Sequence, residues 1–363
     1  MIKQRAYDIS KTNVANIGSE LDHKIKAAAA GKEPAWAKTG KEAGTYVWRI
    51  EQFLVVEVPA KMVGKFYDGD AYIVLHSVKN AKGLLSHTIH FWLGDGCSQD
   101  EAGTAAYKTV ELDEFLGGGP VEYREVQGFE SNLFISLFPN FTVLHGGVAS
   151  GFKHVEAGTY PTRLLHVHGD RKTVYVDEVP AEGKSLNQGD VFILDLGLKL
   201  IQWNGSKSSG NERIKAGQYA AAIDAERMGK ATISVHAEGD SDLAEFWKTL
   251  GGEVAPQPPI QHTVTKREKA VWKLSDASGS LSFTQVSKGA IAKSSLDSAD
   301  VFIVDSGSTV FAWVGSKTTA QERRGALGFA SSYLANNSLA PTTNIVKVID
   351  GGESPEFDAA FKA

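Results

Sequence analysis

Residues 202–216 of the chain read QWNGSKSSGNERIKA, and residues 312–326, 110 positions later, read AWVGSKTTAQERRGA. The stretches just upstream also match, because GDVFILD at 189–195 corresponds to ADVFIVD at 299–305 with the same offset. A self-match that keeps one long offset through both stretches predicts a duplicated structural unit. The fold is therefore expected to be a tandem array of similar domains.

A third copy of the pattern lies nearer the N-terminus. GDAYIVL at 69–75 corresponds to GDVFILD, and HFWLGDGCSQDEAGTAA at 90–106 corresponds to QWNGSKSSGNERIKA. In all three copies a glutamate follows the tryptophan of the motif by nine positions. The 363 residues therefore divide into three repeats, each of ordinary domain size.

Each repeat reads as strands, a long helix, a further strand and a short helix. In the second copy, VFILD and KLIQW flank a Leu-Gly turn, which is typical of a hairpin. A helix follows, with Ser208 or Ser209 as its N-cap and Gly229 at its end. TISVHAEG then predicts a strand, and LAEFWKTLGG predicts a short helix. The expected fold class is α+β: three tandem repeats, each with a central mixed or antiparallel sheet between a long and a short helix.

The repeats and the segments around them divide the chain into five parts. The stretch from Glu253 to Glu268 is rich in proline and polar residues, which is typical of an extended linker. The expected parts are an N-terminal extension at 1–44, repeat 1 at 45–152, repeat 2 at 153–255, the linker at 256–268 and repeat 3 at 269–363.

Composition excludes several classes of protein. The net charge of −5 argues against general nucleic-acid binding, which requires a basic surplus. No apolar run is long enough to predict a transmembrane segment, and the opening MIKQRAYDIS lacks the apolar stretch of a secretory signal. The single cysteine, Cys97, cannot form an intrachain disulfide, which fits a reducing compartment.

The sequence contains no G-x-S-x-G, H-E-x-x-H, Walker or C-x-x-C motif, so we expect no enzyme activity. Two alternatives stay open at this point. Cys97 could be a nucleophile, although a small residue in a loop is the simpler interpretation. His166 and His168 alternate along a predicted strand and could form a metal-binding pair, although ordinary surface or core positions are the simpler interpretation.

Three pairs of carboxylates recur with the repeats. In each pair the aspartate precedes a predicted strand, and the glutamate lies near the start of the long helix. The pairs are Asp70 with Glu101, Asp190 with Glu212, and Asp300 with Glu322. Two carboxylates beside a backbone carbonyl offer the hard oxygen ligands that Ca²⁺ prefers. The alternative is structural, with the aspartate closing a turn and the glutamate complementing a helix N-terminus.

Longer runs of sequence resemble a known family. GDAYIVL, HFWLGDGCSQDEAGTAA, VQGFESNLF and GGVASGFKHV resemble the first gelsolin repeat, and GDVFILD with NERIKA is similar to the second. The whole chain resembles the gelsolin and villin superfamily in its three-repeat severin and fragmin type. The resemblance implies Ca²⁺-dependent severing of actin filaments, capping of barbed ends and nucleation. The alternative is a Ca²⁺-dependent capping or side-binding protein that does not sever.

The resemblance further implies where the protein acts and what it binds. It would work in the cytoplasm and cytoskeleton, bind actin monomers and filaments, and be a monomer when free. Phosphatidylinositol bisphosphate would be a further partner, bound through Arg163, Arg171 and Lys172. The basic run that the family uses upstream of GGVASGF is LFPNFTVLHGG here, and it contains no lysine.

Calcium ligands are also implied by the resemblance, with one site in each repeat. The ligands would be the Gly69 carbonyl, Asp70, Glu101 and the Val148 carbonyl in the first repeat, the Gly189 carbonyl, Asp190 and Glu212 in the second, and the Ala299 carbonyl, Asp300 and Glu322 in the third. A further ion, shared with actin, would be bound by Asp113 and the carbonyls of Gly118 and Pro120.

Actin contacts are implied for the long helix of the first repeat, near residues 100–116. Tyr107, Val110 and Glu114 would lie on the face that enters the cleft of actin. Phe152 matches the residue that leads along the filament toward the second repeat. An apolar helix face in a hydrophobic groove is a common recognition mode.

Overall fold

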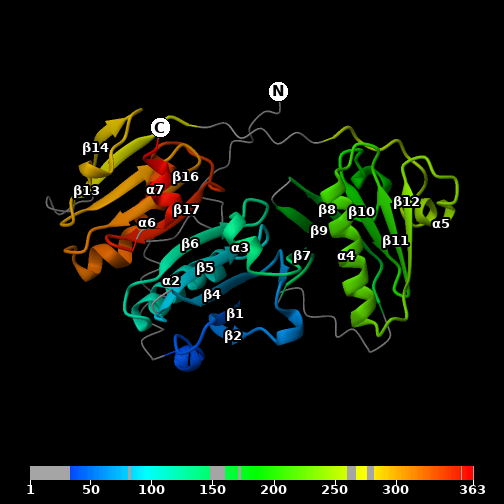
Figure 1. Ribbon diagram of the computed structural model, residues 1–363, viewed down its shortest axis with the longest axis horizontal. Helices are drawn as coiled ribbons and strands as arrows, with labels where there is room; N and C mark the ends of the chain where they lie inside the picture. The colour runs from blue at the N-terminus through cyan, green and yellow to red at the C-terminus, as the bar shows by residue number, and fades with distance from the viewer. Residues whose placement is uncertain are drawn as a thin grey trace. The chain divides into compact units, whose positions relative to one another are not determined.

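The computed structural model of the chain consists of two compact units, each built around one sheet (Figure 1). Unit 1 holds repeats 1 and 3, and unit 2 holds repeat 2 together with two short segments of repeat 1. Unit 1 is Met1–Val63, Asp68–Leu137 and Val264–Ala363, and unit 2 is Gly64–Tyr67 and Phe138–Thr263. The structure describes residues 33–80, 83–147, 160–170, 173–259, 267–275, 282–352 and 354–362.

The sheet of unit 1 has ten strands in the order β14-β13-β15-β16-β17-β6-β5-β4-β1-β2. Repeat 1 contributes β1 (Gly44–Glu51), β2 (Leu54–Glu57), β4 (Ala71–Lys79), β5 (Leu85–Leu93) and β6 (Val121–Val126). Repeat 3 contributes β13 (Ala270–Ser275), β14 (Ser282–Lys288), β15 (Val301–Asp305), β16 (Thr309–Val314) and β17 (Asn344–Ile349). The two halves join where β17 pairs antiparallel with β6.

The sheet of unit 2 has seven strands in the order β12-β11-β10-β8-β9-β7-β3. Repeat 2 contributes β8 (Arg163–Gly169), β9 (Val174–Val179), β10 (Val191–Asp195), β11 (Lys199–Asn204) and β12 (Thr232–Ala237). The remaining two strands are β3 (Lys65–Tyr67) and β7 (Thr142–Leu144). Strand β12 therefore forms one edge of this sheet.

One strand pattern recurs in all three repeats. The first long strand of each repeat (β1, β8 or β13) pairs antiparallel with the first strand of a hairpin. The strand after the long helix (β6, β12 or β17) pairs parallel with the second strand of that hairpin. The long helices are α2 (Gln99–Phe115), α4 (Gly210–Glu226) and α6 (Ala320–Asn336), and the short ones are α3 (Asn132–Ser136), α5 (Ala244–Thr249) and α7 (Pro355–Ala360). The predicted α+β class and its mixed sheets are confirmed.

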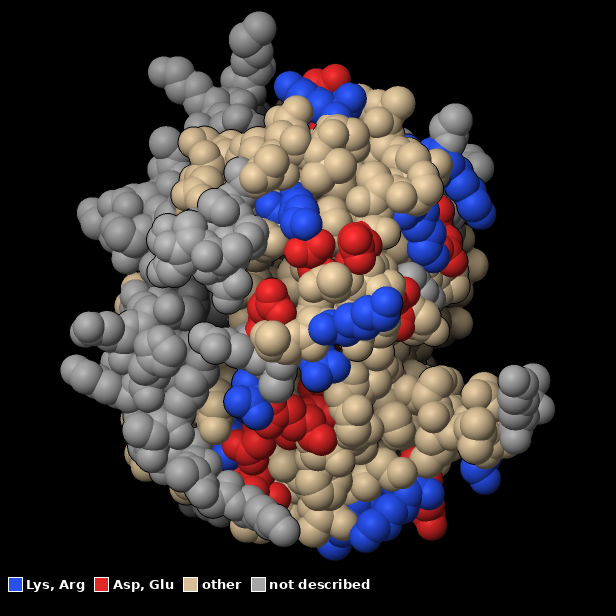
Figure 2. All heavy atoms as spheres, turned by 90° about the vertical axis from the view of Figure 1, so that its left-hand side faces the viewer, with Lys and Arg blue, Asp and Glu red and all other residues tan. Residues whose placement is uncertain are grey.

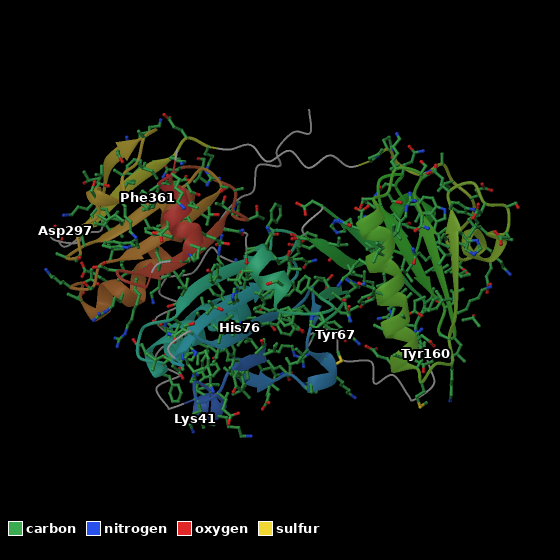
Figure 3. The ribbon with its side chains drawn as sticks, viewed as in Figure 1. Lys41, Tyr67, His76, Tyr160, Asp297 and Phe361 are labelled. Carbon is green, nitrogen blue, oxygen red and sulfur yellow. The ribbon has the colours of Figure 1, made fainter. Side chains whose placement is uncertain are left out.

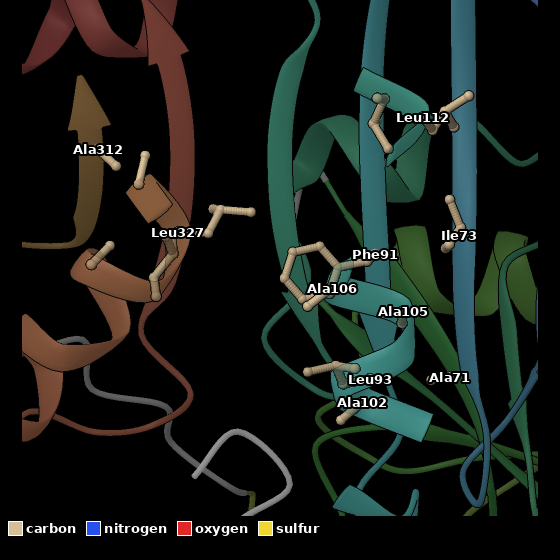
Figure 4. Close-up of a cluster of buried hydrophobic side chains, with 14 of the residues drawn as sticks. Ala71, Ile73, Phe91, Leu93, Ala102, Ala105, Ala106, Leu112, Ala312 and Leu327 are labelled. Atoms are coloured by element: carbon tan, nitrogen blue, oxygen red, sulfur yellow. The ribbon is translucent and has the colours of Figure 1, made fainter. Parts of the chain in front are cut away.

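Helices cover both faces of each sheet, which explains why the central strands are almost entirely apolar. In unit 1, α2 and α6 contribute to a single core, whose labelled side chains in Figure 4 come from β4, β5 and α2 of repeat 1 and from β16 and α6 of repeat 3. On the opposite face, α7 buries Phe357. In unit 2, α4 buries Tyr219 and Ile223 on one face, and α5 buries Phe246 on the other.

The last residues of the predicted N-terminal extension at 1–44 pack against repeat 1. The 3-10 helix η2 (Pro34–Lys38) inserts Trp36, which is 1% exposed, into the core of unit 1. Its ring meets Trp48 edge to face, with the centroids 4.9 Å apart. Such aromatic pairs add about 0.5–1.5 kcal/mol beyond the area that they bury.

The predicted boundaries of repeats 1 and 2 also differ from the structure. Strands β3 and β7 lie within the predicted repeat 1 in the sequence, but in the structure they belong to the sheet of unit 2. There β7 pairs parallel with both β3 and β9. The Thr142 hydroxyl in β7 donates a 2.7 Å hydrogen bond to Tyr219 Oη of α4, and Lys65 of β3 forms an ion pair with Glu226. The added strands cover the edge that β9 would otherwise expose, which removes a site of edge pairing.

The predicted linker begins as part of repeat 2. Gln188 N donates to Gln257 O at 2.8 Å, and Gln257 N donates to Leu186 O at 2.9 Å, so this segment pairs with the chain ahead of β10. Residues 260–266 lie outside the described part of the chain. Among the described residues, no helix combines the length and the apolar character needed to cross a bilayer.

Candidate metal centres and actin-binding helix

The recurring glutamate has the same structural role in all three repeats. It is the third residue of the long helix and forms a capping box with the serine or threonine that precedes the helix. Glu101 Oε2 accepts from Ser98 N at 3.0 Å, Glu212 Oε2 from Ser209 N at 2.7 Å, and Glu322 Oε2 from Thr319 N at 2.8 Å. The structural alternative for these glutamates is therefore confirmed, and the N-cap of α4 is Ser209. These capping-box bonds use Oε2 of each glutamate and leave Oε1 outside the capping box.

The recurring aspartate is held next to this helix start by the glycine two positions after the tryptophan. The amide nitrogens of Gly94, Gly205 and Gly315 donate to the carbonyls of Asp70, Asp190 and Asp300 at 3.1, 3.0 and 3.1 Å. A Cβ atom at these glycines would lie only 2.2–2.5 Å from a backbone oxygen of the loop before the aspartate. Only glycine permits this approach, which brings aspartate and glutamate to the same end of the sheet.

In repeat 1, Asp70 is fully buried at the start of β4. Tyr72 Oη donates a 3.4 Å hydrogen bond to its Oδ2, and Arg49 Nη1 lies 3.6 Å from the same oxygen. The buried carboxylate therefore faces a cationic side chain. The remaining predicted ligand, the Val148 carbonyl, lies outside the described residues.

In repeat 2, the predicted ligand Asp190 is already engaged by two donors. His166 Nε2 and Asn187 Nδ2 each lie 2.7 Å from Asp190 Oδ2. Burial alone would raise the pKa of Asp190, but these two hydrogen bonds outweigh it and lower the pKa below its ordinary value. Glu212 is 3% exposed, and its Oε1 accepts from Gly169 N at 3.2 Å. Asp190 and Glu212 are thus both hydrogen-bonded to residues of β8.

In repeat 3, Asp300 is the least buried of the three recurring aspartates. Lys273 Nζ lies 2.6 Å from Asp300 Oδ2, and the two side chains are 41% and 24% exposed. The preceding Ala299 donates its amide to Asp297 Oδ1 at 3.0 Å, and Asp297 lies at the outer end of this repeat (Figure 3). All three sites offer carboxylate and carbonyl oxygens, a donor set that fits Ca²⁺.

The fourth predicted site is occupied by a lysine of repeat 3. Asp113, at the end of α2, forms an ion pair with Lys347 Nζ at 2.9 Å, and Lys347 also contacts the Glu122 carboxylate. All three side chains are almost completely buried. Burial raises the pKa of Glu122 well above its ordinary value, and the neighbouring Asp113 adds to this rise. The Gly118 amide donates to the Asp113 carbonyl at 2.8 Å, whereas Pro120 is buried beside β6.

The helix that would enter actin is covered along two sides within unit 1. Glu114 forms an ion pair with Arg324 of α6, so the third repeat lies against the predicted contact face. From the N-terminal side, Trp36 Nε1 donates to Glu111 at 3.1 Å, and Glu33 pairs with Lys108 at 2.8 Å. Tyr107 and Val110 are half-buried between these contacts. Phe152 lies outside the described residues.

Comparison with known proteins decides the family. The profile described as "Gelsolin repeat" matches residues 52–135, 172–247 and 282–357, one match in each repeat. The chain belongs to the gelsolin family. The predicted family and three-repeat organisation are thereby confirmed.

Several relatives cover the gelsolin-family chain from end to end or nearly so. Gelsolin-like protein 2 of Lumbricus terrestris is 42% identical over 100% of this chain and 99% of its own length. Gelsolin-like protein 1 of the same organism is 43% identical over 87% of this chain and 86% of its own. Severin of Echinococcus granulosus is 37% identical over 94% and 95%. A crystal structure of the Thorarchaeota 2DGel3/rabbit actin complex matches 56% of this chain at 23% identity, with a TM-score of 0.25 that is too low to compare architectures.

The predicted phosphoinositide residues fall at the start of the second gelsolin repeat. Arg163 donates to Asp195 Oδ2 at 2.7 Å, so its charge is already paired. Arg171 and Lys172 lie outside the described residues. Figure 2 shows the side on which repeat 3 is drawn in Figure 1, and basic and acidic side chains are interspersed on that face.

The two alternatives for enzyme chemistry receive ordinary structural roles in the gelsolin fold. Cys97 is 7% exposed and packs in the core of unit 1. His166 and His168 do share one face, with ring centroids 4.3 Å apart, but each is hydrogen-bonded to its own carboxylate, Asp190 or Asp177. The histidines therefore hold structural hydrogen bonds on β8.

Two features of the site were missed from the sequence. The first is Lys347, whose partners are more than 200 positions away and carry no local signal. The second is a cluster in unit 2, where His236 Nδ1 lies 3.1 Å from Asp242 Oδ1 and 3.9 Å from Asp240 Oδ2. A histidine followed at four and six positions by aspartates, after a strand, was the available signal.

Proposed function

We propose that this gelsolin-family chain is a Ca²⁺-dependent actin-binding protein that severs filaments, caps their barbed ends and nucleates new ones. Support comes from relatives of matching length, one of which is named severin. The family consists of actin-binding proteins rather than enzymes. The observation that carries the proposal is the position of Lys347, which lies between Asp113 and Glu122 at the end of α2.

The contacts of Lys347 support the proposal that repeats 1 and 3 form a closed state in this structure. The ammonium group of Lys347 lies next to the carboxylate of Asp113, the residue proposed to bind an ion together with actin, and takes the place of that ion's charge. Repeat 3 also places Arg324 on Glu114, so α6 covers part of the proposed actin-binding face of α2. Actin can therefore reach α2 only after repeat 3 has moved away.

The seam that has to open is short. Strands β17 and β6 pair through three residues of each strand, in which Ile345, Val346 and Lys347 face Arg124, Tyr123 and Glu122. Arg124 also donates to the carbonyls of Pro341 and Thr343 at 2.7 and 2.6 Å. A ligand can open this seam only to the extent that it binds the open state more tightly than the closed one.

Calcium is proposed to supply that difference. When bound, the ion would add positive charge at the Asp70 and Glu101, Asp190 and Glu212, and Asp300 and Glu322 pairs. All three aspartates already contact protein donors in the closed state, namely Tyr72 on Asp70, His166 on Asp190 and Lys273 on Asp300. These donors have to give up the carboxylate oxygens that they occupy. Ligand binding is thereby coupled to rearrangement at the start of β10 and β15.

Two finer points belong to the same proposal. The protein is proposed to act in the cytoplasm on the actin cytoskeleton. Phosphatidylinositol bisphosphate remains a proposed partner, but the pairing of Arg163 with Asp195 supports only a small contribution from that residue. Arg171 and Lys172 would carry more of such binding.

Imaging of single fluorescent actin filaments tests the function directly. In Ca²⁺ we expect breaks along filaments, followed by barbed ends that no longer grow, and in chelator we expect neither. Arrested ends without breaks, or protein bound along intact filaments, would support the capping or side-binding alternative. Filaments that behave alike with and without the protein in Ca²⁺ would overturn the proposal.

A further inference from the structure

The strand that follows the long helix pairs differently in repeat 2 than in repeats 1 and 3. In unit 1, β6 and β17 are these strands, and they pair with each other. Their counterpart in repeat 2 is β12, which pairs parallel with β11 and forms the edge of the seven-stranded sheet. Among the described strands, two copies of this edge pair with each other, and the third copy, β12, has no strand beyond it.

The pairing of β6 with β17 is close to two-fold symmetric. Each strand is aligned by its register with the preceding tryptophan-bearing strand, which places Arg124 and Lys347 at equivalent positions. Glu122 and Ile345 are equivalent in the same way. Because Arg124 faces Ile345 and Lys347 faces Glu122, the pair is centred on Tyr123 facing Val346. The geometry of this edge is therefore suited to pairing with a copy of itself.

In β12, apolar side chains occupy the equivalent positions and are exposed. The register with β11 places Val235 where Arg124 and Lys347 stand, and Ile233 where Glu122 and Ile345 stand. Val235 is 60% exposed and Ile233 is 41% exposed, whereas their four counterparts in unit 1 are at most 2% exposed. The strand reads TISVHA and has no lysine, glutamate or proline, the residues that usually protect a free edge.

The long helix beside β12 shows the same replacement of charge by apolar surface. In unit 1, Arg324 of α6 pairs with Glu114 of α2. Counted from the capping-box glutamate, the equivalent positions of α4 are Ile214 and Ala225. Ile214 is 63% exposed, and Ala225 is exposed as well. A self-pairing of this face would therefore bring Ile214 of each copy toward Ala225 of the other.

The residue at the centre of the β12 edge, Ser234, has a buried hydroxyl group without a hydrogen-bond partner among the described residues. Ser234 lies between Ile233 and Val235, and its register partner Ile201 places it on the α5 face. In a two-fold pairing equivalent to that of β6 with β17, Ser234 would face Ser234 of the second copy.

We propose that β12 is a self-association edge, through which two copies of this chain pair antiparallel as a symmetric dimer. Ile233 of each copy faces Val235 of the other, and the two α4 helices lie side by side. The interface is isologous, so the same patch serves both copies. An edge as short as that between β6 and β17 forms a weak, concentration-dependent dimer. The proposal is independent of actin and of Ca²⁺.

Sedimentation velocity of the full chain over a wide range of concentrations tests the proposal. Wild-type protein should show a reversible monomer–dimer equilibrium. Val235→Lys or Ile233→Glu alone should weaken association at least about tenfold, because each dimer would bury two unpaired charges against apolar side chains. Lysine and glutamate are the residues found at these positions in β17 and β6, so both variants should fold.

Mixing the two variants provides the decisive measurement. In the mixed dimer, the lysine introduced in one variant faces the glutamate introduced in the other, as Lys347 faces Glu122 in unit 1. The equimolar mixture of Val235→Lys and Ile233→Glu should therefore associate more strongly than either variant alone. Leu54→Lys, on the exposed edge strand β2, is the matched control and should associate like wild type. A wild-type chain that stays monomeric at all concentrations, or a mixture without rescue, would overturn the proposal.

Discussion

Lys347 of the third repeat and Asp113 of the first are joined by a 2.9 Å ion pair whose side chains are only 3% and 6% exposed. The lysine also contacts Glu122, so one ammonium group compensates two buried carboxylates. Burial alone would lower the pKa of Lys347, but the two carboxylates raise it above its ordinary value. The lysine is therefore charged throughout the physiological range, and its charge stabilises the seam between β6 and β17.

Replacing Lys347 by methionine should weaken this seam strongly. The substitution removes the charge and leaves two carboxylates buried together, which typically costs about 3–5 kcal/mol. We expect severing to reach half its maximum at a lower Ca²⁺ concentration, and the amides of β6 and β17 to exchange faster in chelator. Lys288→Met is the control, because Lys288 pairs with Glu268 on an exposed surface of the same repeat. An unchanged Ca²⁺ midpoint for Lys347→Met would rule out the proposed closure.

The two roles assigned to Glu101 can be separated by two variants. Glu101→Gln keeps an oxygen for the capping box but removes the charge, so one Ca²⁺ should be lost from the titrated stoichiometry with little change in stability. Ser98→Ala removes the cap and should cost about 1 kcal/mol of stability while all Ca²⁺ sites remain. Calorimetric Ca²⁺ titration and thermal unfolding of both variants make the comparison. If Glu101→Gln bound the full complement of Ca²⁺ with wild-type affinity, Glu101 would have only its capping role.

The glycine after the tryptophan motif should not tolerate a methyl group. In Gly205→Ala the new Cβ would lie 2.5 Å from the Gln188 carbonyl oxygen, and relief requires movement of the backbone. Overpacking of this kind typically costs about 1–3 kcal/mol. Gly210→Ala, five positions on at the start of α4, meets nothing within 4 Å and should be neutral or slightly stabilising. Urea unfolding measures both, and equal stabilities would contradict the close approach.

Asp195 should make the stability of unit 2 sensitive to acid. It is fully buried and accepts hydrogen bonds from Arg227 at 2.8 and 2.7 Å and from Arg163 at 2.7 Å. Arg227 Cζ lies 4.3 Å from the ring centroid of Tyr160, and Tyr160 is labelled in Figure 3. Burial alone would raise the pKa of Asp195, but the two arginines lower it below its ordinary value. A lowered folded-state pKa means that this stabilisation is present above the unfolded pKa, about 3.9, and is lost as the pH falls through the folded value.

Asp195→Asn should therefore lose about 3–5 kcal/mol at neutral pH, because the buried Arg227 and the half-buried Arg163 lose their anionic partner. Its unfolding midpoint should also depend less on pH in the acid range than that of wild type. Urea unfolding at neutral pH and near pH 3 measures both effects. Wild-type stability of Asp195→Asn at neutral pH would show that the arginines do not depend on this charge.

What could be predicted from the sequence was local and repeated. The capping boxes, the tryptophan-bearing hairpins and the paired carboxylates each fall within about thirty residues, and the three copies confirm one another. Lys347 could not be predicted in this way, because its contact with Asp113 spans 234 positions and occurs once. Trp36 was missed because a 3-10 helix of five residues has no periodicity to detect. Strands β3 and β7 have three residues each, too few to show an alternating pattern.

The position of β3 and β7 in the sheet of unit 2 has a practical consequence for recombinant fragments of this protein. A fragment that begins at residue 153 would contain β8 to β12 but would lack both added strands, so β9 would become an open, aggregation-prone border. A fragment that ends at residue 152 would carry β3 and β7 with no sheet to join. Because the sheet of unit 2 contains two strands that the repeat 1 part of the sequence encodes, we expect a cut between repeats 1 and 2 to yield fragments that fold less well than the intact chain.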